Sequence, residues 1–182
     1  MVSRISQRYD DISAFCKDCT PTAQRRYVEH PFDAYQRESA TLTDLNLAFG
    51  DGSAATWLVP QLTDLSEFCG CKNKLQPHQL KEVAILLSRK YSYVKVSEFL
   101  LFFSKLKLGE YGTFYGSLDP MVITSAFLEF LDDRSAALTK IDEALREKKA
   151  EEENKIPVYT YEEWKKLQQA REQGTNILKP NR

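Results

Sequence analysis

Apolar residues recur at helical spacing along most of the chain from residue 53 onward, whereas strand-like alternation is scarce. The first long helix is predicted after the break "GDGS" at 50–53, with Ser53 as its cap. Pro60 is expected to kink this helix or mark a late start, and Gly70 is a suitable end. Its apolar positions are Trp57, Leu58, Leu62, Leu65 and Phe68.

Two further helices are predicted in the middle of the chain. Pro77 starts one that reaches about Tyr91, because proline fits the first turn of a helix. The stretch 91–97 alternates briefly and is expected to be a short extended connector. Ser97 is expected to cap the next helix, which Gly109 terminates. The inward positions are Leu80, Val83, Ala84, Leu86, Leu87, Phe99, Leu100, Phe103 and Leu106.

A long, increasingly polar helix is predicted to follow. It starts at Asp119 and Pro120, since the aspartate accepts hydrogen bonds from unpaired N–H groups and proline suits the first position. Between residues 146 and 155 no apolar residue larger than alanine occurs, which predicts a solvated helix. The remaining expectations are a stop at Pro157, a capping box of Thr160 with Glu163, and a short last helix to about Gly174.

The first fifty residues carry weaker signals and predict only short helices, for example around Phe15, after Pro21 and around Leu45. Several of these pieces are expected to be loosely attached. We therefore predict an all-α fold, a small helical bundle with appendages. Residues 1–52 form an N-terminal helical arm, 53–138 the core domain, and 139–182 a long charged C-terminal helical extension.

The stretch "KLKLGEYGTFYGSLDPMV" at 105–122 is the most unusual part of the sequence. Its three glycines raise the hypothesis of a phosphate-binding loop. Their spacing fits neither a P-loop nor the dinucleotide fingerprint, and they lie between two helices rather than after a strand. A compact turn is favoured, in which Tyr111, Phe114 and Tyr115 fold back to close the end of the bundle.

Residues 99–134 also resemble a family of small α-helical proteins encoded on bacterial mobile elements and bacteriophages, marked by a Tyr-Gly-x-x-Tyr-Gly signature. With the upstream part 57–93, the likeness covers about half of the chain. The family has no securely assigned function, but its general look is similar to accessory proteins of phage replication such as helicase loaders. The matching positions are Phe102, Phe103, Lys107, Gly109, Tyr111, Gly112, Tyr115, Asp119 and Arg134.

Composition narrows the class of protein. The chain of 182 residues has 42% hydrophobic residues and a net charge of -1, which fits a globular protein and excludes a polybasic one. The charged N-terminal stretch lacks the apolar segment of a secretory signal, and the apolar runs are too short to span a membrane. We therefore expect a soluble, cytoplasmic protein with reduced thiols.

Charge is distributed unevenly within this neutral total. Residues 89–107 contain five bases and one acid, whereas 129–153 contain nine acids and five bases. Bases mixed with tyrosines suit contacts with phosphates and stacked nucleobases. The alternative, slightly favoured, is that the two regions neutralise each other. The candidate contact residues are Arg89, Lys90, Tyr91, Tyr93, Lys95, Lys105, Lys107, Tyr111 and Tyr115.

Specific chemistry has few candidates. Cys16 and Cys19 form a CxxC, and Cys69 and Cys71 a CxC, so four thiolates are weak candidates for a zinc site. Unligated thiols are the default, and no cofactor is expected. The common motifs of metalloproteases, serine hydrolases and P-loop enzymes do not occur in the sequence.

We therefore expect a non-enzymatic protein that binds another macromolecule. The preferred partner is a protein, docked by the N-terminal arm or by the tail 140–182, and an accessory role in DNA replication is one form of this hypothesis. The alternative is a nucleic-acid-binding module that uses the basic face 89–107. A small-ligand binder or enzyme using the loop 111–115 is a third hypothesis, and no membrane is expected to be involved.

Overall fold

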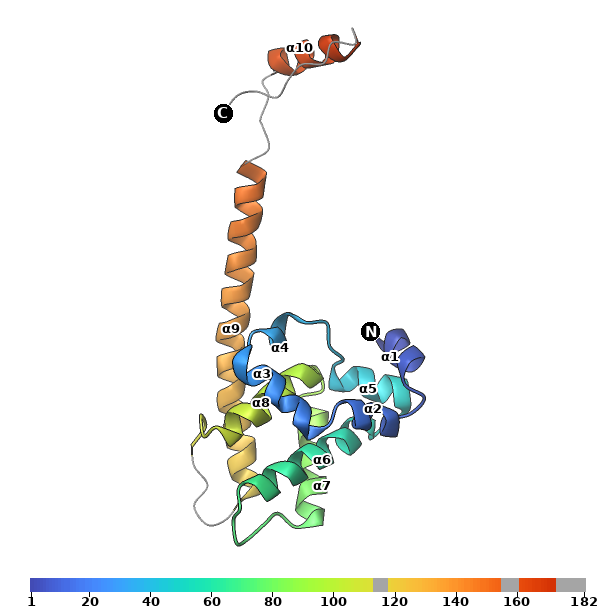
Figure 1. Ribbon diagram of the computed structural model, residues 1–182, viewed down its shortest axis with the longest axis vertical. Helices are drawn as coiled ribbons and strands as arrows, with labels where there is room; N and C mark the ends of the chain where they lie inside the picture. Colours follow the sequence, from blue (N-terminus) through green and yellow to red (C-terminus); the bar gives the residue numbers. More distant parts are fainter. Residues whose placement is uncertain (113–117, 155–160, 173–182) are drawn as a thin grey trace. The chain divides into compact units, whose positions relative to one another are not determined.

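The computed structural model of the protein describes residues 1–112, 118–154 and 161–172 (Figure 1). Over these ranges the chain forms ten α-helices and one 3-10 helix and no β-strand, so the predicted all-α class is confirmed. One isolated antiparallel bridge joins Thr41 to Lys95. No described helix has both the length and the apolar character that crossing a membrane requires.

The N-terminal part consists of short helices. None of the first four α-helices is longer than seven residues, and each turns only one or two side chains into the interior. The elements are α1 (Val2–Arg8), α2 (Ile12–Asp18), the 3-10 helix η1 (Pro21–Arg25), α3 (Arg26–Glu29), α4 (Asp33–Gln36) and α5 (Leu42–Phe49).

Longer helices follow, and they match the predicted order. Pro77 and Pro120 each begin a helix, and the Asp119 carboxylate accepts from the Met121 N–H at 2.7 Å, as the sequence predicted. The elements are α6 (Ser53–Phe68), α7 (Pro77–Lys90), α8 (Val96–Lys107), α9 (Pro120–Asn154) and α10 (Tyr161–Glu172). Pro157, Thr160 and Gly174 lie outside the described residues.

Helix α8 is the centre of the core. Ten of its twelve residues are buried, because its apolar side chains cover the whole circumference rather than one stripe. The Phe99 ring stacks on Phe127 of α9 at 4.8 Å between centroids, and Phe102 meets the same ring edge-on at 4.9 Å. Trp57 of α6 packs against Phe99 at 6.3 Å. Aromatic burial around α8 therefore joins α6, α8 and the first part of α9.

The N-terminal segment is not a loosely attached arm, and in this respect the structure differs from our expectation. Residues 1–139 form one compact unit, with no division near residue 52. In Figure 1 the blue helices α2 and α3 lie beside α6 and α8, and the contacts between these elements agree with the picture. The segment buries Ile5, Phe15, Tyr27, Ala34, Tyr35, Leu42 and Leu45. Each short helix has too few apolar positions to show a periodic pattern in the sequence. Their common contribution to the core is seen only when the helices are packed together.

Two predicted helix caps are corrected by the structure. Ser53 is the first residue of α6 rather than its cap, and the Ala54 N–H instead donates to Asn46 Oδ1 of α5 at 2.9 Å. Ser97 lies inside α8, where its hydroxyl donates to the Ala34 carbonyl oxygen at 2.7 Å. The Ser97 hydroxyl thus joins two segments that are distant in sequence, which a local capping pattern cannot reveal.

Two apolar side chains assigned to inward faces are exposed instead. Phe68 at the end of α6 is 61% exposed and Leu86 of α7 is 53% exposed. Phe68 is the last residue of its helix, and Leu86 flanks a narrower inward face of Leu80, Val83, Ala84 and Leu87. Helix α6 continues through Pro60 to Phe68.

Residues 140–182 form a second unit. Its described side chains are almost entirely exposed, from Asp142 to Glu153 on α9 and from Tyr161 to Lys166 on α10. Ile141 and Gln168 are the described exceptions, and both are half-buried. This part of the chain is therefore helical without a packed apolar face among the residues described.

Candidate functional site

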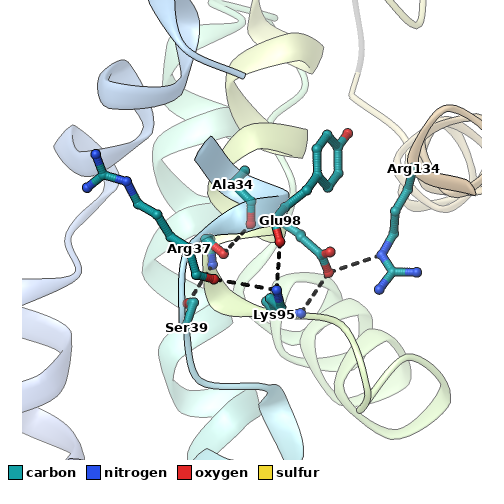
Figure 2. A network of polar contacts seen from close by, with 8 residues as sticks. Ala34, Arg37, Ser39, Lys95, Glu98 and Arg134 are labelled. Atoms are coloured by element: carbon teal, nitrogen blue, oxygen red, sulfur yellow. Dashed lines mark hydrogen bonds and ion pairs between the residues drawn. The ribbon is translucent and has the colours of Figure 1, made fainter. Parts of the chain in front are cut away.

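A polar network surrounds the start of α8 (Figure 2). Glu98, at the third position of the helix, has no exposed side-chain surface. Its Oε2 accepts from the Lys95 N–H at 3.0 Å and lies 3.0 Å from Arg134 Nε of α9. The contact with Arg134 is an ion pair without the alignment of a hydrogen bond. Glu98 therefore caps its own helix and holds α9 against it.

The same helix start is tied to the segment 34–39. Lys95 Nζ donates to the carbonyl oxygen of Tyr35 at 2.8 Å and approaches that of Arg37 at 3.4 Å. The Ser97 N–H donates to Ser39 Oγ at 3.2 Å. Figure 2 shows Lys95 bonded to the chain at Arg37, with Ala34 and Ser39 close by. These are bonds between protein groups, and they anchor α4 rather than present a reactive group.

Within this network the Arg134 guanidinium compensates the charge of the Glu98 carboxylate. The Arg134 guanidinium carbon lies 5.6 Å from the centre of the Tyr93 ring, and its side chain is only 19% exposed. Glu98 Oε1 has no hydrogen-bond partner among the described atoms. Burial, together with the neighbouring Glu98 carboxylate, raises the pKa of Tyr35 to about 12. The neutral Tyr35 phenol and the Glu98–Arg134 ion pair are suited to holding helices in position. The network does not contain a nucleophile next to a base.

A second polar cluster lies at the other end of α8. Lys105 Nζ is 2.9 Å from a Glu110 carboxylate oxygen and 3.3 Å from one of Asp133. Burial acts to lower the pKa of Lys105, but the Glu110 hydrogen bond and the two carboxylates outweigh it and leave that pKa raised. The Tyr111 hydroxyl also donates to Asp133, at 2.9 Å.

Tyr111 folds back onto the bundle, as predicted for the glycine-aromatic turn. Its ring centre lies 6.2 Å from that of Phe102 and 6.5 Å from that of Phe130. Burial and the hydrogen bond to Asp133 raise its pKa. Phe114 and Tyr115, the other aromatic residues of the predicted turn, lie outside the described residues.

The basic residues proposed for nucleic-acid contact do not gather on one open face. Lys95, Lys105 and Lys107 are all engaged, the last in an ion pair with Asp64 of α6. Tyr91 is buried against Phe127 with 4.8 Å between ring centres. Arg89 and Lys90, at the end of α7, are exposed, and Lys90 lies over the Tyr91 ring.

The four cysteines carry free thiols. Cys16, Cys19 and Cys69 are half-buried and Cys71 is buried. Burial raises the pKa of Cys19 and of Cys69 to about 11, and it also raises that of Cys16. Within the described ranges no group of three or more cysteine, histidine or acidic residues is placed to hold a metal ion. The CxxC and CxC pairs thus form no four-thiolate site in this structure.

The structure also reveals a cavity that the sequence reasoning missed. It has a volume of about 450 Å³ and lies between the N-terminal helices and the start of α8. Arg4, Arg8, Arg26, Tyr9 and Tyr27 line it. The concentration of arginine and tyrosine in the first thirty residues was a usable signal, but we assigned that segment to a loosely attached arm.

A smaller groove of about 260 Å³ lies at the opposite end of α8. Val28, Phe68 and Leu108 line it, each about half exposed or more. The Lys107–Asp64 ion pair forms part of its wall. Its volume falls below the range of about 300–1,000 Å³ that is usual for small-molecule sites.

Comparison with known proteins adds one relationship. No curated protein and no solved structure is significantly similar to this chain. Residues 74–175, more than half of the chain, match a family of unknown function, DUF6633. The match begins just before α7 and ends beyond α10, so it includes Lys95, Glu98 and Arg134 of the network and residues 140–175 of the C-terminal unit, but not the segment 34–39. The protein is therefore a member of the DUF6633 family of unknown function.

Proposed function

We propose that this protein is non-enzymatic and binds a partner protein through its C-terminal segment, residues 140–182. The observation that carries the proposal is the exposure of that segment. Every described side chain from Asp142 to Glu153 is exposed, including Leu145 at 59%. Most of the stability of a helix in a protein comes from packing one of its faces, and the stretch from Asp142 to Glu153 packs none. Helices of this polar kind often cross the solvent between two domains.

An aromatic pair supplies a specific contact point within this segment. Tyr161 and Trp164 stack with 6.2 Å between ring centres and an angle of 25°. They remain 74% and 50% exposed. Tyrosine and tryptophan are the residue types that most often dominate binding energy in protein interfaces. The family match runs through this pair, so the proposed contact falls inside the region that the family shares.

We extend the proposal to the origin of the protein and its location in the cell. Origin from a mobile element or phage, with an accessory role in DNA replication, is supported by the resemblance of residues 99–134 described above. The free thiols are the usual state in a reducing compartment and support a cytoplasmic location. The nucleic-acid alternative has less support, because acceptors in the protein occupy three of its five bases.

A pair of double variants tests the docking proposal. Tyr161→Ala with Trp164→Ala removes the aromatic pair, whereas Glu162→Ala with Lys165→Ala changes neighbouring exposed positions of the same helix. The full-length proteins are compared by cross-linking and mass spectrometry in the cells that produce them. We expect one partner to cross-link to residues 140–182 of the wild type.

The affinity for that partner is then measured with purified proteins. Loss of an aromatic hot spot weakens binding about 30-fold, whereas the charge control changes it little. The proposal fails if the aromatic variant keeps wild-type affinity, or if every cross-linked protein attaches only to residues 1–139.

A further inference from the structure

The cavity beside the N-terminal helices has the size of a small-molecule site. Its volume of about 450 Å³ lies within the range of about 300–1,000 Å³ typical of such sites. Side chains of α1, α2, α3 and α8 line it together, so it exists only because the first fifty residues pack onto the core. Ile5, Phe15 and Leu100, each at most 6% exposed, give it an apolar lining.

The rim of the cavity carries exchangeable charges. Arg4 pairs with Glu38, and Arg8 pairs with Asp18 at 2.8 Å. The Tyr9 hydroxyl also donates to Asp18. Both arginine side chains are 69% exposed, and ion pairs at that exposure are weak. An incoming anion can therefore replace a carboxylate as the partner of either arginine at little cost.

Two further polar groups of the lining form neither an ion pair nor a hydrogen bond within the described part of the chain. Arg26 forms no ion pair, and the Tyr27 hydroxyl forms no hydrogen bond there. Tyr27 is only 6% exposed, so its phenol is held in the wall of the cavity. Among its charged side chains the lining contains three arginines against the two carboxylates of Asp18 and Glu38, which leaves an excess of one positive side chain.

We propose that this cavity binds a small ligand that carries one anionic group on a compact apolar body. The apolar body contacts Ile5, Phe15 and Leu100, and the anionic group pairs with Arg26 and accepts a hydrogen bond from Tyr27. A guanidinium matches both carboxylate and phosphate, so these two anions are the chemical class. Most of the lining lies before residue 74, outside the family match, so the site is independent of the docking proposed for residues 140–182.

Calorimetric titration of the full-length protein tests the assignment. The probes are phenyl phosphate, phenylacetate and the neutral benzyl alcohol. We expect saturable binding of at least one anion, weakened by salt, and no comparable binding of the alcohol. A preference for phenyl phosphate or for phenylacetate then decides between the two anions.

A matched pair of charge variants localises the site. Arg26→Gln removes the unpaired arginine of this cavity, whereas Arg25→Gln removes its neighbour, which lines the other groove. Both arginines are exposed, so both variants are expected to fold. Because Arg26→Gln loses a charged hydrogen bond, its affinity for the anion is expected to fall about 10-fold. The affinity of Arg25→Gln is expected to stay near that of the wild type.

Tyr27→Phe provides a second measurement that keeps the ring and its packing. We expect weaker binding of the anion with an unchanged unfolding midpoint. The assignment is overturned if neither anion binds saturably in the millimolar range, if benzyl alcohol binds as well as the anions, or if Arg25→Gln weakens binding as much as Arg26→Gln.

Discussion

At the scale of single residues, Glu98 connects more of this protein than any motif in its sequence suggested. Its carboxylate caps α8 through the Lys95 N–H and forms an ion pair with Arg134 of α9. A fully buried carboxylate is costly to desolvate, and its pairing offsets that cost only while the partner is present. The pair therefore specifies how α9 lies against α8, although its net contribution to stability need not be large.

This argument predicts an asymmetry between single and double variants. Arg134→Met leaves Glu98 buried without a counter-charge and is expected to lower the free energy of unfolding by about 3 kcal/mol. Adding Glu98→Gln, which retains the bond to the Lys95 N–H, should recover most of that loss. Urea denaturation followed by circular dichroism measures both.

Arg37→Met is the matched control, because Arg37 pairs with Asp33 at 2.8 Å in a far more exposed setting. Its cost is expected to stay below about 1 kcal/mol. Equal losses for Arg134→Met and Arg37→Met would show that burial of the Glu98 pair has no energetic weight.

At the scale of elements, both ends of α8 are closed by local chemistry. At the N-terminal end Glu98 accepts from the Lys95 N–H, and a Schellman motif closes the C-terminal end. There the Gly109 N–H donates to the Leu106 carbonyl oxygen and the Glu110 N–H to that of Lys105, both at 3.1 Å. Gly109 has a φ of 80°, which L-residues rarely adopt. The glycine thus directs the chain toward Tyr111.

The motif predicts a graded response at position 109. Gly109→Ala should lower the free energy of unfolding by about 1–2 kcal/mol, because alanine is strained at this φ. Among the described residues the nearest atom to an added Cβ is 3.8 Å away, so the expected cost comes from the backbone conformation. Gly109→Asn is expected to cost less, since asparagine tolerates this region. Equal stability of the alanine variant and the wild type in thermal denaturation would rule out this role.

At the scale of the whole molecule, the N-terminal fifty residues are part of the folding unit. They bury aromatic and aliphatic side chains against α6 and α8, and Trp57 Nε1 donates to the carbonyl oxygen of Cys19 at 3.0 Å. Gln61 donates to the same oxygen at 3.1 Å. Removing the segment would expose apolar surface of α8 and leave polar groups of α6 without their partners.

Two truncations test this organisation. The fragment 1–139 is expected to unfold cooperatively, with a free energy of unfolding within about 0.5 kcal/mol of the full chain, because the described side chains beyond it, except Ile141 and Gln168, are exposed. The fragment 53–138, which the sequence alone suggested as the core domain, is expected not to fold. Circular dichroism melting of both fragments provides the measurement. A cooperative unfolding transition of the fragment 53–138 would show that the N-terminal segment is not needed for folding.

The sequence by itself determined the helical class and most helix starts and stops. Pro77, Pro120 and Gly109 act through their own backbone geometry and their immediate neighbours, so their effects can be read locally. The inward turn of Tyr111 was also predictable, because a tight glycine turn between two apolar helices leaves few other places for its ring.

Only the tertiary structure decided which polar residues meet. Ser97 with Ala34, Glu98 with Arg134 and Lys107 with Asp64 are separated by tens of residues, and nothing in their local spacing specifies these pairs. The same holds for the N-terminal cavity, whose lining comes from several elements. Helical pattern is a local property of the chain, whereas charge pairing and cavities depend on which distant segments share a surface.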